Sequence, residues 1–351
     1  GRRAGRRSRA ARRTTTRSGN AMTIKVGVIG VGVMGAEHAR RLTRVIGGAS
    51  VCGVTDFAGD RAEALAAELG ARVFGSAEEL IDADDVDAVV IASRDADHSA
   101  QVMSCLAHRK PVLCEKPLAP TVAECRAVVD AQTALALPHP LVSVGFMRRF
   151  DPGYTELAAV VRSGAVGEPL LVRCSHRNVA GYPGGDSAET ITNTAIHEID
   201  ITRWLFGSEI VEVSWHAGKS TRADPHRQDP QLLLLRNENG TLTVLDVFVN
   251  ARYGYDVRCE VVGDTGATSL AATPLTRLDQ ALQSRTAYPE DWLPRFAEAY
   301  RLELQAWIDS LAANQPSPLA TAEDGLAATA VAAALIESMN DHGACTSVKQ
   351  P

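Results

Sequence analysis

The chain has 351 residues, enough for two domains of ordinary size, each with its own core. Its 45% hydrophobic and 22% charged residues are typical of a soluble, globular protein, and no apolar run reaches the roughly eighteen residues that a membrane span needs. Residues 1–21 hold eight of the 36 basic residues and no acid, which leaves 28 bases against 42 acids in the rest. That acidic body argues against nucleic acid as a main partner, and no membrane association is expected without a long apolar run.

The arginine-rich segment 1–21 is predicted to be a disordered extension. A transit peptide or a twin-arginine signal is the alternative, although no apolar segment follows the arginines. The seven cysteines are scattered and contain no CxxC pair, which favours reduced thiols in a cytoplasmic protein. No metal site is expected, because the residue four positions after His197 is Ile201 and the HExxH motif is therefore absent.

Short β-branched runs alternate with helical patterns between residues 22 and 145. This alternation predicts a first domain of the α/β class, with the doubly wound parallel sheet of a Rossmann fold. The predicted strands cover 24–30, 50–55, 72–74, 86–92, 110–114 and 141–145, and the first two helices cover 33–44 and 60–69.

The turn after the first predicted strand is rich in glycine and opens the first helix. It fits the G-x-G-x-x-G pattern in Gly30, Val31, Gly32, Val33, Met34 and Gly35. The first glycine allows a tight turn, the second lets a pyrophosphate approach the backbone, and the third lets helix and strand pack closely. The amides at the helix N-terminus then face the phosphates, so the pattern predicts a dinucleotide site.

Asp56 ends the second predicted strand, 21 residues after Gly35. A carboxylate at this place accepts hydrogen bonds from the adenosine ribose hydroxyls and disfavours a 2′-phosphate. The sequence therefore favours NAD as the cofactor. Arg61, one turn later, leaves NADP open as the alternative.

Two later strand ends bring polar residues to the carboxyl edge of the sheet, where α/β proteins bind ligands. Ser93 and His98 follow the fourth strand, where we expect the cofactor to cross the sheet. Glu115 and Lys116 follow the fifth strand and precede Pro117, which fixes the direction of the chain. At this edge, Lys116 is interpreted as a functional residue rather than an ordinary surface lysine.

After residue 145 the strands follow one another without intervening helices, which predicts a second, α+β domain over 146–351 with a mainly antiparallel sheet. Asn239-Gly240 predicts a hairpin turn, and Thr321 with Asp324 predicts a capping box for the last helix. The glycine-rich segment 180–188 is a candidate mobile loop. The predicted strands cover 169–175, 210–215, 231–236, 241–249, 255–262 and 267–270, and the helices 151–162, 193–206, 292–312 and 322–339.

The helix predicted over 193–206 carries Asn193 and His197 four residues apart, so that their side chains share a face and can touch. Asn193 or Thr194 is expected to cap its N-terminus. His197 with a polar neighbour is either a proton-transfer group or a satisfied core histidine. The strand ends of the second domain add Arg148, His176, Asn178 and Tyr255, polar groups suited to a pocket for a polyol.

Taken together, these segments closely resemble the inositol 2-dehydrogenases of the glucose-fructose oxidoreductase/inositol dehydrogenase/rhizopine catabolism family. The resemblance spans roughly residues 24–340 and includes the second domain. The matching segments are IGVGVMG, CEKPLA, VGFMRRFDPGY, GEPLLVRCSHRN, IHEIDITRWL and VFVNARYGYDVRCEVVGDTG.

The resemblance implies a Rossmann domain joined to an open-faced antiparallel sheet, with homotetramers assembled through those sheets. It also implies NAD-dependent oxidation of myo-inositol to scyllo-inosose. Lys116 resembles the family's catalytic lysine and His197 its proton acceptor. Four further residues resemble cyclitol contacts, namely Arg148, His176, Asn178 and Tyr255.

Asn193 departs from the resemblance, because family members with a lysine–aspartate–histidine triad carry aspartate at this position. An amide can orient the histidine but supplies no charge, and the same exchange in the serine-protease triad costs about 10⁴ in kcat. Three possibilities stay open. The protein is a working dehydrogenase with a weakened triad, an enzyme for another cyclitol or sugar, or a weakly catalytic protein that binds NAD and a polyol.

Overall fold

The computed structural model describes residues 23–271 and 276–349, so the predicted extension 1–21 lies outside the described residues. The first domain is built on a seven-stranded sheet in the order β15-β6-β5-β4-β1-β2-β3. All its strands are parallel except β15, as the prediction of a doubly wound sheet requires. The strands are β1 (Ile24–Ile29), β2 (Ala49–Thr55), β3 (Arg72–Val73), β4 (Ala88–Ile91), β5 (Val112–Glu115), β6 (Val142–Gly145) and β15 (Ala320–Thr321).

Helices cover both faces of this sheet, and each face has its own hydrophobic cluster. One cluster joins α1, α2 and α10 to the strands through residues such as Leu42, Leu65 and Trp307. The other contains buried residues of α3, α4 and α5 and continues into the second domain. The helices are α1 (Val33–Arg44), α2 (Gly59–Leu69), α3 (Ala77–Asp82), α4 (Asp95–Ala107), α5 (Val122–Ala134) and α10 (Ala297–Ala313).

The second domain contains a seven-stranded sheet in the order β12-β11-β7-β10-β9-β8-β16. Only β7 and β10 pair in parallel, so the predicted mainly antiparallel sheet is confirmed. Gly240 has a φ of 89° in the β9–β10 turn, where the hairpin was expected. The strands are β7 (Pro169–Arg177), β8 (Ile210–His216), β9 (Gln231–Asn237), β10 (Leu242–Phe248), β11 (Asp256–Gly263), β12 (Ala267–Ser269) and β16 (Thr346–Ser347).

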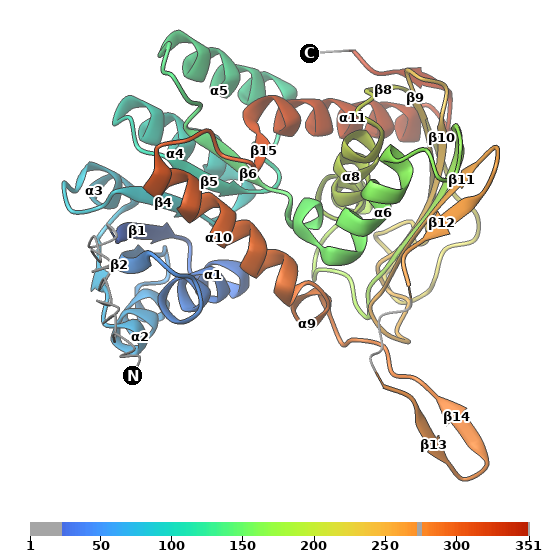
Figure 1. Ribbon diagram of the computed structural model, residues 1–351, viewed down its shortest axis with the longest axis horizontal. Helices are drawn as coiled ribbons and strands as arrows, with labels where there is room; N and C mark the ends of the chain where they lie inside the picture. Colours follow the sequence, from blue (N-terminus) through green and yellow to red (C-terminus); the bar gives the residue numbers. More distant parts are fainter. Residues whose placement is uncertain (1–22, 272–275, 350–351) are drawn as a thin grey trace, which may run out of the picture.

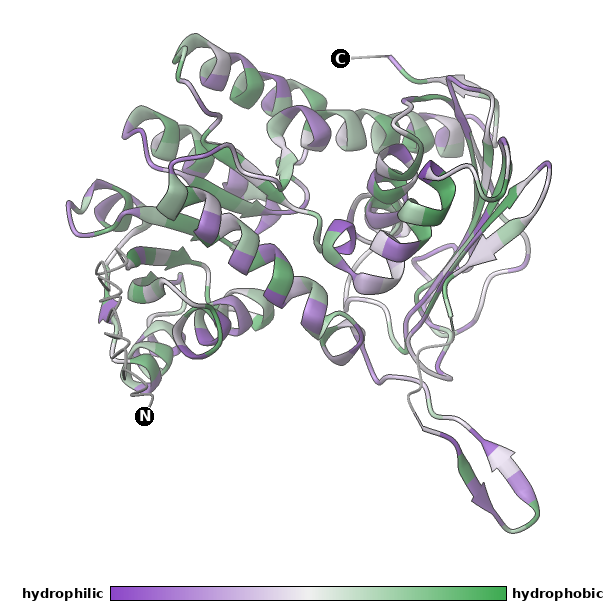
Figure 2. Ribbon diagram, in the orientation of Figure 1, coloured by the Kyte–Doolittle hydropathy of each residue, from purple (hydrophilic) through white to green (hydrophobic). Residues whose placement is uncertain are grey.

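Helices lie on one face of the second sheet, between it and the first domain, whereas no helix covers its outer face in Figure 1. The helix α11 runs from the first sheet to the second and is largely hydrophobic along its length (Figure 2), so its side chains join the two cores. Thr321 and Asp324 form the predicted capping box at its start. The helices on this face are η1 (Met147–Phe150), α6 (Pro152–Arg162), α8 (Ile196–Phe206) and α11 (Ala322–Asn340).

The chain crosses between the domains more than once. After the second sheet it returns through α9 (Trp292–Arg295) and α10 to the first domain, and β15 pairs with β6 there. A single cut at residue 145 therefore does not separate the two sheets. A small hairpin, β13 (Leu278–Gln280) with β14 (Gln283–Arg285), projects away from both domains and was not predicted.

Two helix predictions need correction. The helix expected over 292–312 is broken at Phe296, whose ψ of 18° does not continue α9 into α10. The helix expected to begin at Asn193 or Thr194 begins two turns earlier, at α7 (Ser187–Glu189), and continues through the π-helical segment η2 (Thr190–Ala195) into α8. Asp186 is its N-cap, because the Asp186 carboxylate accepts from the Glu189 amide at 2.8 Å. In the part of the chain that is described, no helix is long and apolar enough to cross a membrane.

Candidate active site

One cavity of about 810 Å³ extends from the glycine-rich turn to the helix that carries His197. Gly30 has a φ of 82°, and a Cβ there would lie 2.5 Å from the Ser93 backbone. A Cβ at Gly35 would overlap the Gly30 carbonyl oxygen, so this glycine is needed for close packing of helix and strand. A Cβ at Gly32 would meet nothing within 4 Å, which leaves the backbone open to the cavity. Val33 and Met34 line it too, and this turn fits a pyrophosphate.

The adenosine end of the site is formed at the ends of β2 and β4. The Asp56 carboxylate lines the cavity and accepts from the amides of Val31 at 2.7 Å and Ala58 at 2.8 Å. Ser93 also lines the cavity. His98 of α4 is buried, and its Nδ1 lies 2.7 Å from the Pro117 carbonyl oxygen and its Nε2 3.3 Å from the Ser93 carbonyl oxygen, so it joins the end of β4 to the segment that carries Lys116.

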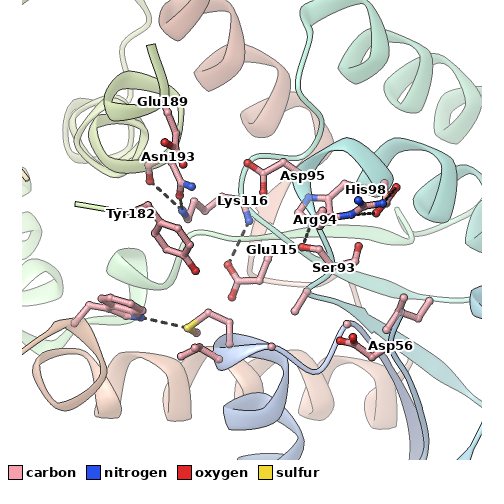
Figure 3. Close-up of a pocket in the computed structure, with 18 of the residues that line it drawn as sticks. Asp56, Ser93, Arg94, Asp95, His98, Glu115, Lys116, Tyr182, Glu189 and Asn193 are labelled. Carbon is pink, nitrogen blue, oxygen red and sulfur yellow. Dashed lines mark hydrogen bonds and ion pairs between the residues drawn. The ribbon is translucent and has the colours of Figure 1, made fainter. Parts of the chain in front are cut away.

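Lys116 follows β5 and points across the cavity to the second domain (Figure 3). Its Nζ donates to the Asn193 backbone oxygen at 2.9 Å and to Asn193 Oδ1 at 2.5 Å. Burial lowers the pKa of Lys116, and the nearby Glu115 carboxylate opposes that shift. Glu115 lies in turn 2.6 Å from His38 Nε2 of α1, a contact that the sequence analysis did not predict. Burial raises the pKa of Glu115, but the His38 hydrogen bond and the Lys116 charge lower it overall.

A second buried cluster lies behind the cavity wall, beside His197. The Glu198 carboxylate pairs with the Arg148 guanidinium, and Glu198 Oε2 lies 3.0 Å from His176 Nδ1. Tyr255 Oη lies 3.4 Å from His176 Nε2. Burial, and then the positive charges of Lys116 and Arg148, lower the pKa of His197 well below its usual value. His197 is therefore neutral at neutral pH.

The structure brings most of the predicted site residues to the one cavity. Four that were assigned to the second domain or its helix line it together with Lys116, namely His176, Asn178, His197 and Tyr255. Arg148 is an exception. Its side chain is 1% exposed and paired with Glu198, so it lies behind the cavity wall and not on it.

Asn193 lines the cavity as expected, but its role as the partner of His197 needs correction. Its side-chain oxygen accepts from Lys116, and among the described residues His197 Nδ1 has no hydrogen-bond partner. The π-helical segment changes the regular helix spacing that the expectation assumed. The comparison with a carboxylate that fixes a histidine tautomer therefore does not apply to this contact. In the described ranges, no cluster of three or more metal-ligating side chains is present.

Several residues of the site carried no signal that the sequence reasoning used. His38 lies in the middle of an ordinary amphipathic helix pattern, and Glu198 was considered only as part of an absent zinc motif. Glu189 ends α7, Arg227 lies in the segment between β8 and β9, and both line the cavity. Glu189 directly follows the glycine-rich segment 180–188, which was noted only as a candidate mobile loop, and nothing in the local sequence marks Arg227.

A glycine-rich turn, an acidic residue at the end of β2 and a lysine at the cavity define a dinucleotide-dependent oxidoreductase. Residues 24–138 match the family model described as "Oxidoreductase family, NAD-binding Rossmann fold". Residues 159–346 match the model described as "Oxidoreductase family, C-terminal alpha/beta domain". The chain therefore belongs to the glucose-fructose oxidoreductase/inositol dehydrogenase/rhizopine catabolism family of oxidoreductases, and NAD is its cofactor.

Curated relatives cover almost the whole chain. It is 52% identical over 330 residues to inositol 2-dehydrogenase 2 of Paenarthrobacter aurescens, which spans 93% of this chain and 99% of that protein. It is 43% identical over 323 residues to inositol 2-dehydrogenase 3 of Saccharopolyspora erythraea, with coverages of 91% and 94%.

Solved structures agree with this fold. The myo-inositol dehydrogenase of Lactobacillus casei in complex with NAD(H) and myo-inositol has a TM-score of 0.90 at 36% identity, covering 93% of this chain and 97% of that one. The scyllo-inositol dehydrogenase of the same organism, with NAD(H) and scyllo-inositol bound, has a TM-score of 0.85 at 28% identity, with coverages of 93% and 99%.

Glu198→Gln tests the buried cluster. We expect it to lower the free energy of unfolding by about 3–5 kcal/mol, because it leaves the buried Arg148 guanidinium without its counter-charge. Glu260→Gln is the matched control. It breaks the exposed ion pair with Arg173 and is expected to cost less than about 1 kcal/mol. Urea denaturation measures both, and equal effects of the two substitutions would contradict the assignment.

Proposed function

We propose that this protein oxidises myo-inositol to scyllo-inosose. The observation that carries the proposal is that Lys116 and His197, from different domains, meet in the cavity that begins at the glycine-rich turn. Relatives named inositol 2-dehydrogenases match nearly the full chain. A similar structure was determined with NAD(H) and myo-inositol bound, which supports a cyclitol as the substrate.

His197 is proposed as the proton acceptor. Its imidazole is neutral, so a ring nitrogen has a lone pair for the proton of a substrate hydroxyl. Two N–H groups of the Lys116 ammonium bind Asn193, and its third donor is proposed to bind the same substrate oxygen. That donor stabilises the negative charge that develops on the oxygen. NAD, when bound, supplies the acceptor for the hydride.

Recognition of a polyol is proposed to come from His176, Asn178 and Tyr255. They line the cavity on the side of the second sheet, and among the described residues Asn178 Oδ1 and His197 Nδ1 have no hydrogen-bond partner. Polar atoms that are removed from water without a partner are costly, so a ligand rich in hydroxyl groups fits this wall. Arg148 is proposed to act indirectly, through Glu198 and His176.

We also propose a homotetramer in the cytoplasm. The outward positions of β9 and β10 include Leu232, Leu234, Val244 and Phe248, an apolar row interrupted by Asp246, on the sheet face that no helix covers in Figure 1. Exposed apolar surface of this kind marks interfaces. All seven cysteines are free thiols, which supports a reducing compartment.

A panel of alcohols with NAD, followed by NADH absorbance, tests the proposed reaction. We expect turnover of myo-inositol above that of scyllo-inositol and glucose. Lys116→Met is expected to lower kcat by at least about 10²-fold, because the donor to the developing alkoxide is lost, while NAD binding measured by calorimetry persists. Absence of turnover with every cyclitol would contradict the proposal, and so would full activity of Lys116→Met.

Asn193→Asp separates the main proposal from a second candidate, a weakly catalytic protein that binds NAD and a polyol. The amide that contacts Lys116 favours this candidate, because it leaves the ammonium without a bonded carboxylate. Under the main proposal the parent already turns over, and the variant changes kcat by less than about tenfold. The second candidate requires calorimetric binding without turnover in the parent and turnover gained in Asn193→Asp. A variant slower than its parent excludes it.

Light scattering after size exclusion tests the assembly. We expect the parent to elute with the mass of four chains, and Val244→Lys to give smaller species because a charge enters the apolar row. Glu337→Gln, on the surface of α11, is the control and should leave the mass unchanged. A monomeric parent would contradict the proposed tetramer.

A further inference from the structure

We propose that Glu189 is the residue through which the proton released by alcohol oxidation leaves the cavity. This inference rests on the proposed function. The continuous helix formed by α7, η2 and α8 carries Glu189, Asn193 and His197 at intervals of four residues, and all three line the cavity. The π-helical segment between them departs from regular helix spacing, but all three side chains line the one cavity, so they form a polar stripe along its wall.

The stripe runs from a buried end to an accessible end. His197 is 9% exposed, whereas the Glu189 side chain is 32% exposed. Lys116 contacts the middle of the stripe at Asn193. Figure 3 shows Glu189 beyond Asn193, on the side of that residue away from Lys116. Glu189 is thus the carboxylate of the stripe that both faces the cavity and has access to solvent.

The proton cannot be kept at His197. The charges of Lys116 and Arg148 disfavour an imidazolium there, in addition to the effect of burial. Glu198, the carboxylate next in sequence, is occupied by Arg148 and His176. A base in this environment turns over only if its proton is passed on quickly.

Glu189 is held in place by its surroundings. Its Oε2 lies 3.4 Å from an Arg227 nitrogen, and Arg227 also donates to the Tyr182 carbonyl oxygen at 3.1 Å. A Cβ on Gly185 would overlap the Glu189 carboxylate, so the absence of a side chain there makes room for it.

Burial and several nearby charged groups act on the pKa of Glu189. Burial raises its pKa, the Arg227 and Lys116 charges lower it, and those of Asp186 and Asp95 raise it, for a pKa above the usual value. A carboxylate with a raised pKa accepts a proton more readily than an ordinary one and still releases it to water near neutral pH.

The proton transfers balance without a further reactant. The substrate O–H bond breaks as its proton binds to a His197 nitrogen. Lys116 gives one ammonium proton, through water in the cavity, to the Glu189 carboxylate, and the neutral amine formed in this way then takes the proton held at His197. The Glu189 O–H bond then breaks, and the proton goes to bulk water.

Steady-state kinetics of Glu189→Gln test the proposed role of Glu189 in proton release, with the alcohol that the parent oxidises best. We expect kcat to fall at least about tenfold in dilute buffer, and to recover when imidazole is added, because a small base can enter the open cavity. The parent should lose activity as the pH falls through the raised pKa of Glu189, since the acceptor is then already protonated. The variant should lack this acid limb.

Two other substitutions complete the kinetic test. Gly185→Ala displaces the carboxylate without removing it and should show the same loss and recovery. Asp95→Asn removes another cavity carboxylate and should show no imidazole recovery. Three results would overturn the proposal. The kcat of Glu189→Gln could be unchanged, its lost activity could fail to return with imidazole, or imidazole could restore the activity of Asp95→Asn and not that of Glu189→Gln.

A titration without turnover keeps the inference separate from the proposed function. Carbon NMR of glutamate carboxyls, with the Glu189 signal assigned by its loss in Glu189→Gln, should give a pKa above the ordinary value. Lys116→Met should raise that pKa further, because an ammonium that lowers it is gone. If Glu189 has an ordinary pKa that does not change in Lys116→Met, the proposed role of Glu189 in proton release is wrong. If no cyclitol is turned over in the activity panel, only the proposed function is wrong.

Discussion

The hydrogen bonds from Lys116 Nζ to the two oxygens of Asn193 join the domains at the place where chemistry is expected. Lys116 is fixed at the end of β5, and Asn193 lies in a π-helical segment whose irregular turn directs a backbone carbonyl oxygen to the lysine. The dinucleotide turn, His176 and His197 line one cavity, and this contact lies on its wall. The domains are also joined by α11 and the common core, so the contact is set on a rigid frame.

Burial of charge is the second constraint on the site. Lys116, Arg148 and two histidines lie close together, balanced by Glu115 and Glu198. Each carboxylate is paired, Glu115 with His38 and Glu198 with Arg148 and His176. The arrangement keeps His197 neutral, while Lys116 Nζ donates to Asn193 and the Arg148 guanidinium is paired with Glu198. A neutral base beside a cationic donor is the combination that removal of a hydroxyl proton requires.

The first domain could be predicted from sequence because local rules agree there. Each feature there can be interpreted from its sequence neighbours alone, as with the strand runs, the Gly30–Gly35 turn and Asp56. The family match and the strand order support the same fold. The sequence predicted the second sheet as mainly antiparallel. It did not predict strands β15 and β16 or the return of the chain to the first domain through α10, because these depend on contacts between distant segments. The predicted start of the helix that carries His197 was wrong. The cap at Asp186 and the π-helical segment leave no simple periodicity in the sequence, so the pattern did not show where this helix begins. Asn193 lines the cavity as expected, but its hydrogen-bond partner is Lys116, across the domain boundary, which helix spacing cannot reveal. Arg148 was expected to contact the cyclitol as one of the polar residues at the strand ends, whereas it is paired with Glu198 behind the cavity wall.

The central claim is that a hydride passes directly from a cyclitol carbon to NAD in the cavity shared by Lys116 and His197. Mass spectrometry of the reduced cofactor, formed from myo-inositol deuterated at its ring carbons, tests this most directly. The account predicts NADH that carries one deuterium, formed more slowly than with unlabelled myo-inositol. Undeuterated NADH, or no NADH at all, would contradict it.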